Sequence, residues 1–189
     1  YTDPTFYAEE QERVFSTSWV CVGTHDELDA PGSAIVRSVA GRSVILTRNH
    51  DGDLRGYFNA CRHRGTELLE GDCTLGSTIR CPYHRWTYDR DGTLVATPQF
   101  ADAGVDRFDP ANYGLHTVRV ASWQCLLFVC LSDEAPPIEE WLGDLDQRLA
   151  GYRLAGWRSH LTQDLEFAAN WKLVSENFQE YYHLRWVHP

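Results

Sequence analysis

The chain has 189 residues, of which 43% are hydrophobic and 13% are aromatic, so a packed globular body is expected. Its formal net charge is −10 and it shows no basic patch, which argues against nucleic acid as the main partner. It contains no long apolar run, so no membrane span is predicted, and no signal peptide is visible. The six cysteines form no evident disulfide framework, which favours a reducing, cytoplasmic location.

The first half of the chain reads as a helix followed by short strands. Residues 5–18 place apolar side chains on a shared face and acids early in the run, which predicts an amphipathic helix. The pattern then changes to β-branched and aromatic runs separated by turn residues, which predicts a small antiparallel barrel or sandwich. Six runs have this character: 19–22, 34–39, 43–47, 54–58, 117–120 and 126–129. Asp91-Gly92 between 86–89 and 93–95 predicts a hairpin.

The later part of the chain mixes loose connections with helices. Residues 96–115 contain several Pro and Gly and read as a connection. Residues 138–149 fit an amphipathic helix with Pro137 near its start. Residues 170–183 suit a second helix, capped by Asn170.

Two short motifs offer metal ligands. Cys61 and His63 form a C-x-H pattern, and Cys81 and His84 form a C-x-x-H pattern, both at predicted strand ends. Zinc accepts two thiolates and two imidazoles, and so does a [2Fe–2S] cluster in which two histidines replace two cysteines on one iron. Structural zinc is the commoner use of such a set, but zinc fingers usually pair Cys with Cys and His with His. Each half here mixes the two, as a cluster of this kind needs.

A second polar group lies near the end of the chain. Asn177, Glu180 and His183 are spaced by three residues, so they form one stripe on the predicted helix. A stripe of this kind is usually a solvated helix face. His188 weighs against that, because five residues after His183 an ideal helix would point the two side chains well apart. Pro189 also disfavours helical geometry at His188, so we expect the helix to unwind between the two histidines.

These motifs resemble those of one known family. C-R-H-R-G at 61–65 and C-P-Y-H-R-W at 81–86 are similar to the Rieske motif of ring-hydroxylating oxygenase α-subunits. Respiratory Rieske proteins carry an extra cysteine in each loop, where this chain has residues such as Gly65 and Tyr83. N-F-Q-E-Y-Y-H-L-R-W-V-H at 177–188 resembles the iron-site helix of the same oxygenases.

The resemblance implies an α+β fold that is divided into parts. An all-β Rieske [2Fe–2S] domain, built from antiparallel strands with two cluster-binding loops, precedes the start of an α+β helix-grip-type catalytic domain. The implied division is an N-terminal helix packing on the catalytic domain (1–18), the Rieske domain (19–115) and the beginning of the catalytic domain (116–189).

The resemblance also implies two cofactors and their ligands. It assigns the [2Fe–2S] cluster to Cys61, His63, Cys81 and His84. It assigns a mononuclear Fe(II) to His183 and His188, two legs of a 2-His-1-carboxylate triad. Glu180 takes the place of the family's bridging acid, which links the cluster of one subunit to the iron of its neighbour, although many aromatic dioxygenases carry Asp there. Asn177 matches a position near the iron. The third ligand lies far downstream in this family, so residues 1–189 alone are expected to be inactive.

The implied function is that of an oxygenase component. Electrons pass from the cluster to the Fe(II), which activates O2 for hydroxylation or oxidative demethylation of a small organic substrate. The implied partners are an NAD(P)H-dependent reductase or ferredoxin and further copies of the chain, in a trimer. The motif with Glu180 is similar to oxygenases of quaternary ammonium compounds, such as betaine demethylases and carnitine or choline monooxygenases, while aromatic-ring dihydroxylation stays open. Two rival functions are a stand-alone Rieske electron carrier and a zinc-stabilised binding module.

Overall fold

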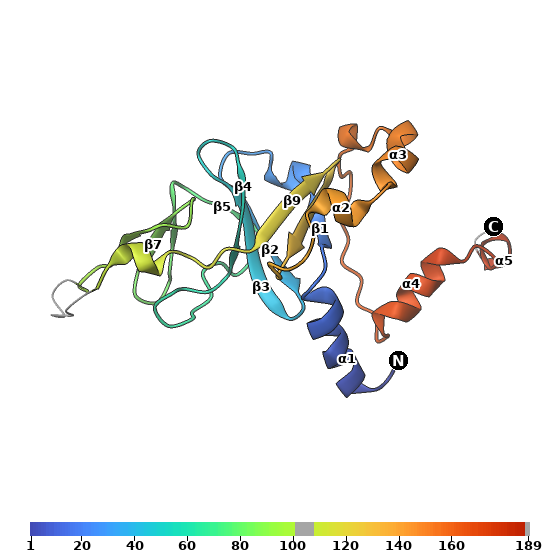
Figure 1. Ribbon diagram of the computed structural model, residues 1–189, viewed down its shortest axis with the longest axis horizontal. Coiled ribbons are helices and arrows are strands. Elements are labelled where there is room, and N and C mark those ends of the chain that lie inside the picture. The colour runs from blue at the N-terminus through green and yellow to red at the C-terminus, as the bar shows by residue number, and fades with distance from the viewer. Residues whose placement is uncertain (101–107, 188–189) are drawn as a thin grey trace.

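The structure is a computed structural model that describes residues 1–100 and 108–187, and its strands form three antiparallel sheets. The strands are β1 (Val20–Thr24), β2 (Ser33–Val39), β3 (Arg42–Arg48), β4 (Leu54–Phe58), β5 (Cys73–Thr74), β6 (Thr78–Arg80), β7 (Thr87–Asp89), β8 (Leu94–Ala96), β9 (Arg119–Trp123) and β10 (Leu126–Cys130). The helices are α1 (Pro4–Glu10), α2 (Ile138–Leu142), α3 (Leu145–Leu149), α4 (Trp171–Gln179) and α5 (Leu184–Val187). The expected α+β class is confirmed, with the sheets at one end and the later helices at the other (Figure 1).

The three sheets stack along the molecule. Sheet A has the order β1-β10-β9, sheet B has β4-β3-β2-β5, and sheet C has β6-β7-β8. In sheet B, β2 and β3 pair in continuous register from Ala34 opposite Thr47 to Val39 opposite Arg42. A tight turn joins them at residues 40 and 41, both with positive φ, as two-residue hairpin turns require. The turn expected at this place is confirmed.

Sheet B has a core on each face. Ile45 of β3 packs with Tyr57 and with residues of sheet C, whereas Val44 and Leu46, its neighbours in the chain, pack against sheet A. Successive side chains of a strand point to opposite faces, so a strand covered on both sides is buried throughout. Gly56 of β4 allows the close approach of sheet A, because a Cβ there would lie 2.3 Å from a methyl of the Val120 side chain.

Sheet A crosses the expected division of the chain. β1 pairs with β10, with Val20 opposite Val129 and Thr24 opposite Leu126, and β10 pairs with β9 along its length. The boundary expected between residues 115 and 116 therefore separates β1 from both strands that complete its sheet. The body made by the three sheets extends through residue 130.

Of the helices predicted over 5–18 and 138–149, the structure contains the first and divides the second. The helix expected over 5–18 is confirmed as α1 and a π-helical turn, Gln11–Phe15, and the Asp3 carboxylate caps it by accepting two backbone N–H groups. The single helix expected over 138–149 is wrong. Gly143 has a φ of +58°, which lies outside helical geometry, so the segment forms α2 and α3 instead. Residues 101–107, within the expected connection, lie outside the described part of the chain.

The C-terminal helix is shorter than the prediction of 170–183. α4 starts after Asn170, whose side chain caps it as expected, but it ends at Gln179. Glu180 is extended, and its carboxylate accepts the backbone N–H of Tyr182 at 2.6 Å, which replaces a helical hydrogen bond. The unwinding expected after His183 therefore occurs before it.

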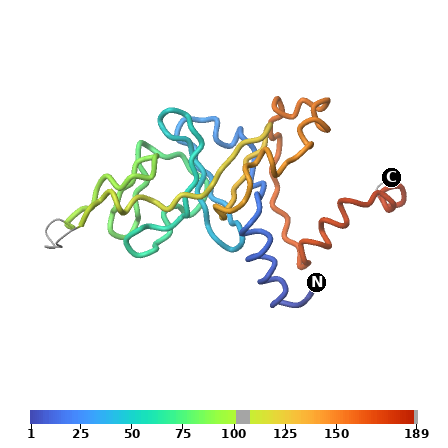
Figure 2. The backbone as a smooth tube through the Cα atoms, in the orientation of Figure 1, coloured from blue at the N-terminus to red at the C-terminus, as the bar shows by residue number. Residues whose placement is uncertain are grey.

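The N-terminal helix lies beside the start of α4, although the two are far apart in the sequence (Figure 2). Lys172 forms an ion pair with Glu10, and the Phe15 and Trp171 rings meet edge to face at 5.1 Å. Among the described helices, none combines the length and apolar character needed to cross a membrane.

Candidate metal centres

The two ligand loops are tight turns at strand ends, as expected. Cys61 follows β4, and its carbonyl accepts the N–H of Gly65 at 2.8 Å, while its own N–H donates to Thr66 at 2.8 Å. Cys81 follows β6, and its N–H donates to the carbonyl of Trp86 at 2.8 Å. Each hydrogen-bonded turn places a cysteine and a histidine from one short segment close together.

The two loops come together in space. The rings of His63 and His84 meet at a centroid distance of 4.6 Å. Cys61 and Cys81 are 3% and 2% exposed and belong to the same core. Burial raises the pKa of the Cys61 thiol, and the neighbouring Cys81 adds to that rise. The structure thus joins all four residues of the predicted site, with the thiols inside the core and the imidazoles nearer the surface.

The donor set fits a two-iron cluster. A single tetrahedral zinc needs all its ligands to converge on one point. Two adjacent thiols and two adjacent imidazoles instead match a [2Fe–2S] cluster that is bound by sulfur on one iron and by nitrogen on the other. Burial also lowers the pKa of His63, which keeps the imidazole neutral and able to bind a metal.

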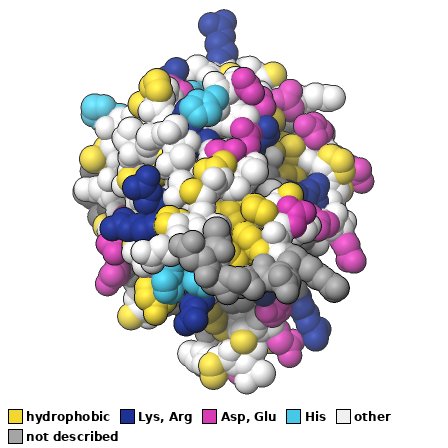
Figure 3. Space-filling model, turned by 90° about the vertical axis from the view of Figure 1, so that its left-hand side faces the viewer, with side chains coloured by type: hydrophobic (Ala, Val, Ile, Leu, Met, Phe, Trp, Pro, Cys, Tyr) yellow, Lys and Arg dark blue, Asp and Glu magenta, His cyan; other side chains and the backbone are white. Residues whose placement is uncertain are grey.

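Three aromatic residues against the ligands were not identified from the sequence. Tyr83 lies over the ring of His84 with centroids 3.8 Å apart, and Trp86 stacks on His63. The Tyr88 hydroxyl lies 3.3 Å from the Cys61 sulfur and accepts the backbone N–H of Arg62 at 3.1 Å. Their place within and just after the C-P-Y-H-R-W motif was the available signal. Histidine, arginine and hydrophobic side chains lie close together on this end of the molecule (Figure 3).

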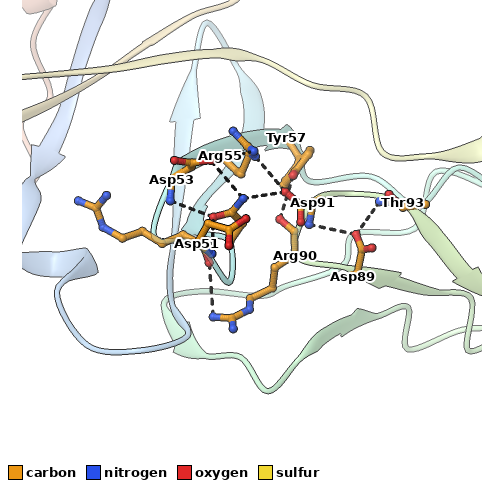
Figure 4. A network of polar contacts seen from close by, with 10 residues as sticks. Asp51, Asp53, Arg55, Tyr57, Asp89, Arg90, Asp91 and Thr93 are labelled. Carbon is orange, nitrogen blue, oxygen red and sulfur yellow. Dashed lines mark hydrogen bonds and ion pairs between the residues drawn. The ribbon is translucent and has the colours of Figure 1, made fainter.

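A polar network holds the turn between β7 and β8 against sheet B (Figure 4). Asp91, in the turn between β7 and β8, accepts hydrogen bonds from Asn49 at 2.9 Å and from Arg55 at 3.2 Å. The Tyr57 hydroxyl donates to the carbonyl of Arg90 at 3.0 Å. Sheet C, which carries the second loop, is thereby held at one end against the strands that carry the first.

The polar group predicted near the end of the chain is present in part. Glu180 forms a hydrogen-bonded pair with Nδ1 of His183, and this contact lowers the pKa of the Glu180 carboxyl. The Asn177 side chain is exposed on α4 and makes no hydrogen bond within the described residues. Because α4 ends at Gln179, Asn177, Glu180 and His183 do not form one stripe on a single helix. His188 lies outside the described residues.

Comparison with protein families decides the affiliation. Residues 18–122 match the family described as Rieske [2Fe-2S] domain, and residues 154–189 match the family described as ring hydroxylating alpha subunit (catalytic domain). The chain belongs to the Rieske-type ring-hydroxylating oxygenase α-subunits. The resemblance seen in its sequence motifs is confirmed.

Several relatives of this Rieske oxygenase chain are named for quaternary ammonium substrates. It is 36% identical over 189 residues to the glycine betaine monooxygenase oxygenase subunit of Chromohalobacter salexigens, covering all of this chain and 42% of that protein. It is 34% identical over 197 residues to the carnitine monooxygenase oxygenase subunit of Acinetobacter baumannii, covering 51% of that protein. A crystal structure of a quaternary ammonium Rieske monooxygenase superposes with a TM-score of 0.92 at 32% identity, covering all of this chain and 53% of that one. The chain therefore spans about half the length of these relatives.

The two candidate centres of the Rieske oxygenase chain lie at opposite ends. The cluster loops belong to the end that carries β7, whereas Glu180 and His183 follow α4 at the other end (Figure 1).

Proposed function

We propose that this chain serves in the oxygenase component of a Rieske system that hydroxylates or oxidatively demethylates a small quaternary ammonium compound. When bound, the [2Fe–2S] cluster supplies one-electron transfer and a mononuclear iron supplies activation of O2. The observation that carries the proposal is the paired imidazoles of His63 and His84 beside the buried thiols of Cys61 and Cys81. Relatives named for glycine betaine and carnitine support the substrate class over aromatic-ring dihydroxylation.

We assign the cluster to these four residues, with sulfur and nitrogen ligands on different irons. Cys61 and Cys81 supply thiolates from inside the core, where water is excluded. His63 and His84 supply imidazoles nearer to the surface, which is where an electron donor can approach. The donor is an NAD(P)H-dependent reductase or a ferredoxin, and the six free cysteines support a reducing, cytoplasmic setting.

The residues after α4 orient a proposed ligand of the mononuclear iron. The contact of Glu180 with Nδ1 of His183 selects the tautomer that protonates this nitrogen, and a carboxylate orients a metal-binding histidine in this way. His188 is the second proposed ligand, and the third comes from outside residues 1–189. We propose that Glu180 also connects to the cluster of a neighbouring copy in a homo-oligomer, a trimer in this family, and that Asn177 lies beside the iron.

We further propose a division of the chain that follows the sheets. The N-terminal helix packs on the catalytic part, as its ion pair between Glu10 and Lys172 supports. The cluster domain runs from about residue 18 and keeps β9 and β10, in place of the expected end at residue 115. The catalytic part then begins after the second core of sheet A, near α2.

Metal analysis of the full-length protein, purified without oxygen, tests the cluster. We expect about two irons and two acid-labile sulfides per cluster domain, with a Rieske-type visible spectrum. Cys61→Ser should remove them, whereas Cys73→Ser, at an exposed cysteine away from the ligands, should not. Zinc in place of iron would refute the assignment and favour the binding module.

A second variant separates an oxygenase from an electron carrier. His183→Ala in the full-length protein should abolish product formation from glycine betaine or carnitine and remove the mononuclear iron. The cluster spectrum should stay unchanged, because His183 belongs to the other end of the chain. Wild-type protein that holds the cluster but binds no further iron would instead be a carrier.

A further inference from the structure

The imidazole of His63 has one face covered by a buried indole. Its ring and that of Trp86 are nearly parallel, at a centroid distance of 4.8 Å and an interplanar angle of 10°. Trp86 is 2% exposed, so this face of His63 is closed to water. The neighbouring ligand ring, His84, meets His63 at an angle of 65° and therefore cannot give the same cover. Among the described residues, the ring that lies over His84 is the exposed Tyr83, so His63 is the imidazole stacked on a ring of the core.

The indole is itself held in place from several sides. The backbone carbonyl of Trp86 accepts the N–H of Cys81, and this hydrogen bond closes the second ligand loop. Phe100 and Tyr113 meet its ring nearly edge-on, at 5.6 Å and 5.9 Å, and Phe108 meets it at 5.8 Å. A ring with this many neighbours cannot turn without repacking the core, so it is a rigid support.

We propose that Trp86 is a positioning residue that fixes the plane of the His63 imidazole and keeps the reduction potential of the cluster low. This inference rests on the proposed role of His63 as a cluster ligand. The torsion that turns an imidazole about its bond to Cβ has a broad energy profile, so an isolated ligand ring is poorly oriented. A parallel indole at 4.8 Å limits that rotation, because tilting the imidazole drives it into the indole.

Two physical effects give the sign of the change in potential. The face of an indole carries the negative end of its quadrupole, which disfavours an added electron on a cluster bound to the ring beside it. The indole also excludes water, which would otherwise stabilise the more negative reduced cluster. Both effects lower the potential, so removing the indole should raise it.

The experiment compares Trp86→Phe and Trp86→Leu in the full-length protein. Trp19→Leu is the matched control, because it removes a buried indole from a core that contains none of the proposed cluster ligands. Iron and sulfide content are measured first, then the midpoint potential by redox titration and the EPR spectrum of the reduced cluster. We expect the potential to rise from wild type to Phe to Leu. The EPR lines should broaden in the same order as the imidazole plane becomes less defined, and the control should match wild type.

The measurements distinguish a wrong cluster assignment from a wrong role for Trp86. Wild-type protein without iron and sulfide would refute the cluster itself. If Trp86→Leu holds a cluster with the potential and EPR spectrum of the control, Trp86 is only a core residue and the inference is wrong. If the leucine variant loses its cluster, the midpoint potential of the phenylalanine variant is compared with that of the control. A potential above that of the control supports the inference, and a potential equal to it overturns the inference.

Discussion

At the scale of single residues, the hydroxyl of Tyr88 lies 3.3 Å from the sulfur of Cys61, a proposed ligand. It accepts the backbone N–H of Arg62, and once Cys61 binds the cluster as a thiolate, which can only accept, the hydroxyl is the donor of this contact. Burial keeps the pKa of Tyr88 well above its ordinary value, so the hydroxyl stays protonated. A hydrogen bond to a cluster sulfur stabilises the reduced state, in which the sulfur carries more negative charge.

Tyr88→Phe should therefore lower the midpoint potential of the cluster. A hydrogen bond of about 1 kcal/mol corresponds to roughly 40 mV for one electron, and redox titration measures this. Tyr57→Phe is the control, because that hydroxyl is equally buried but donates to the carbonyl of Arg90 instead of a sulfur. Equal potentials in the two variants would show that the contact with sulfur has no electronic effect.

The ligands themselves could be predicted from the sequence, but the contact of Tyr88 with Cys61 could not. Cys61 and His63 lie two residues apart, so their spacing is local information. The contact of Tyr88 with Cys61 depends instead on the register of β6 and β7, where Tyr88 lies opposite Ile79. No spacing within one segment encodes that register.

At the scale of elements, α1 and α4 are joined by a charged contact within an aromatic cluster. The Lys172 ammonium forms an ion pair with Glu10 and lies 5.2–5.5 Å from the ring centres of Tyr1, Phe6 and Trp171. The hydrogen bond from Lys172 lowers the pKa of Glu10. Because the folded state depresses this pKa, the contact stabilises the folded state above the ordinary Glu pKa of about 4.3. The stabilisation is lost as the pH falls through the lower, folded value.

Glu10→Gln should increase amide hydrogen exchange of α1 at pH 7, and the difference from wild type should shrink as the pH falls below about 4. Mass spectrometry of peptides from residues 4–10 measures the exchange. Glu9→Gln is the control, since Glu9 is exposed and its pair with Arg13 spans 3.9 Å. An effect of the same size in both variants, or one that persists in acid, would contradict the role of the ion pair.

The errors in the predicted helices have local causes that a periodic pattern does not contain. The apolar spacing of 138–149 continues across Gly143, but the backbone there adopts a positive φ. The spacing of 170–183 continues across Glu180, but its side chain bonds to the backbone two residues ahead. Hydrophobic periodicity records which face is buried and not where the backbone leaves the helix.

At the scale of the whole molecule, sheet A decides which part of the chain can stand alone. Trp19 before β1, Phe128 and Cys130 of β10 and Ile138 of α2 form one core. The sequence could not reveal the pairing of β1 with β10, because it joins segments about a hundred residues apart.

A segment spanning residues 16–143 should therefore fold and hold the cluster with the visible spectrum and potential of the full-length protein. A segment spanning residues 16–115 is the control, and it should fail, because β1 then loses its partner β10 and, with β9, the rest of its sheet. Circular dichroism and iron content compare the two. A stable cluster in the shorter segment would place the end of the domain at residue 115 after all.

The pairing of β1 with β10 also means that the chain enters and leaves the cluster body on adjacent, antiparallel strands. A unit whose two ends are neighbours can be cut out and replaced without moving what lies on either side. Genetic recombination could thus have exchanged such cassettes between oxygenases as single pieces, leaving the substrate-binding half intact. The same two junctions offer a route to chimeric enzymes, in which a cluster body of chosen potential is inserted between an unchanged N-terminal helix and an unchanged catalytic half.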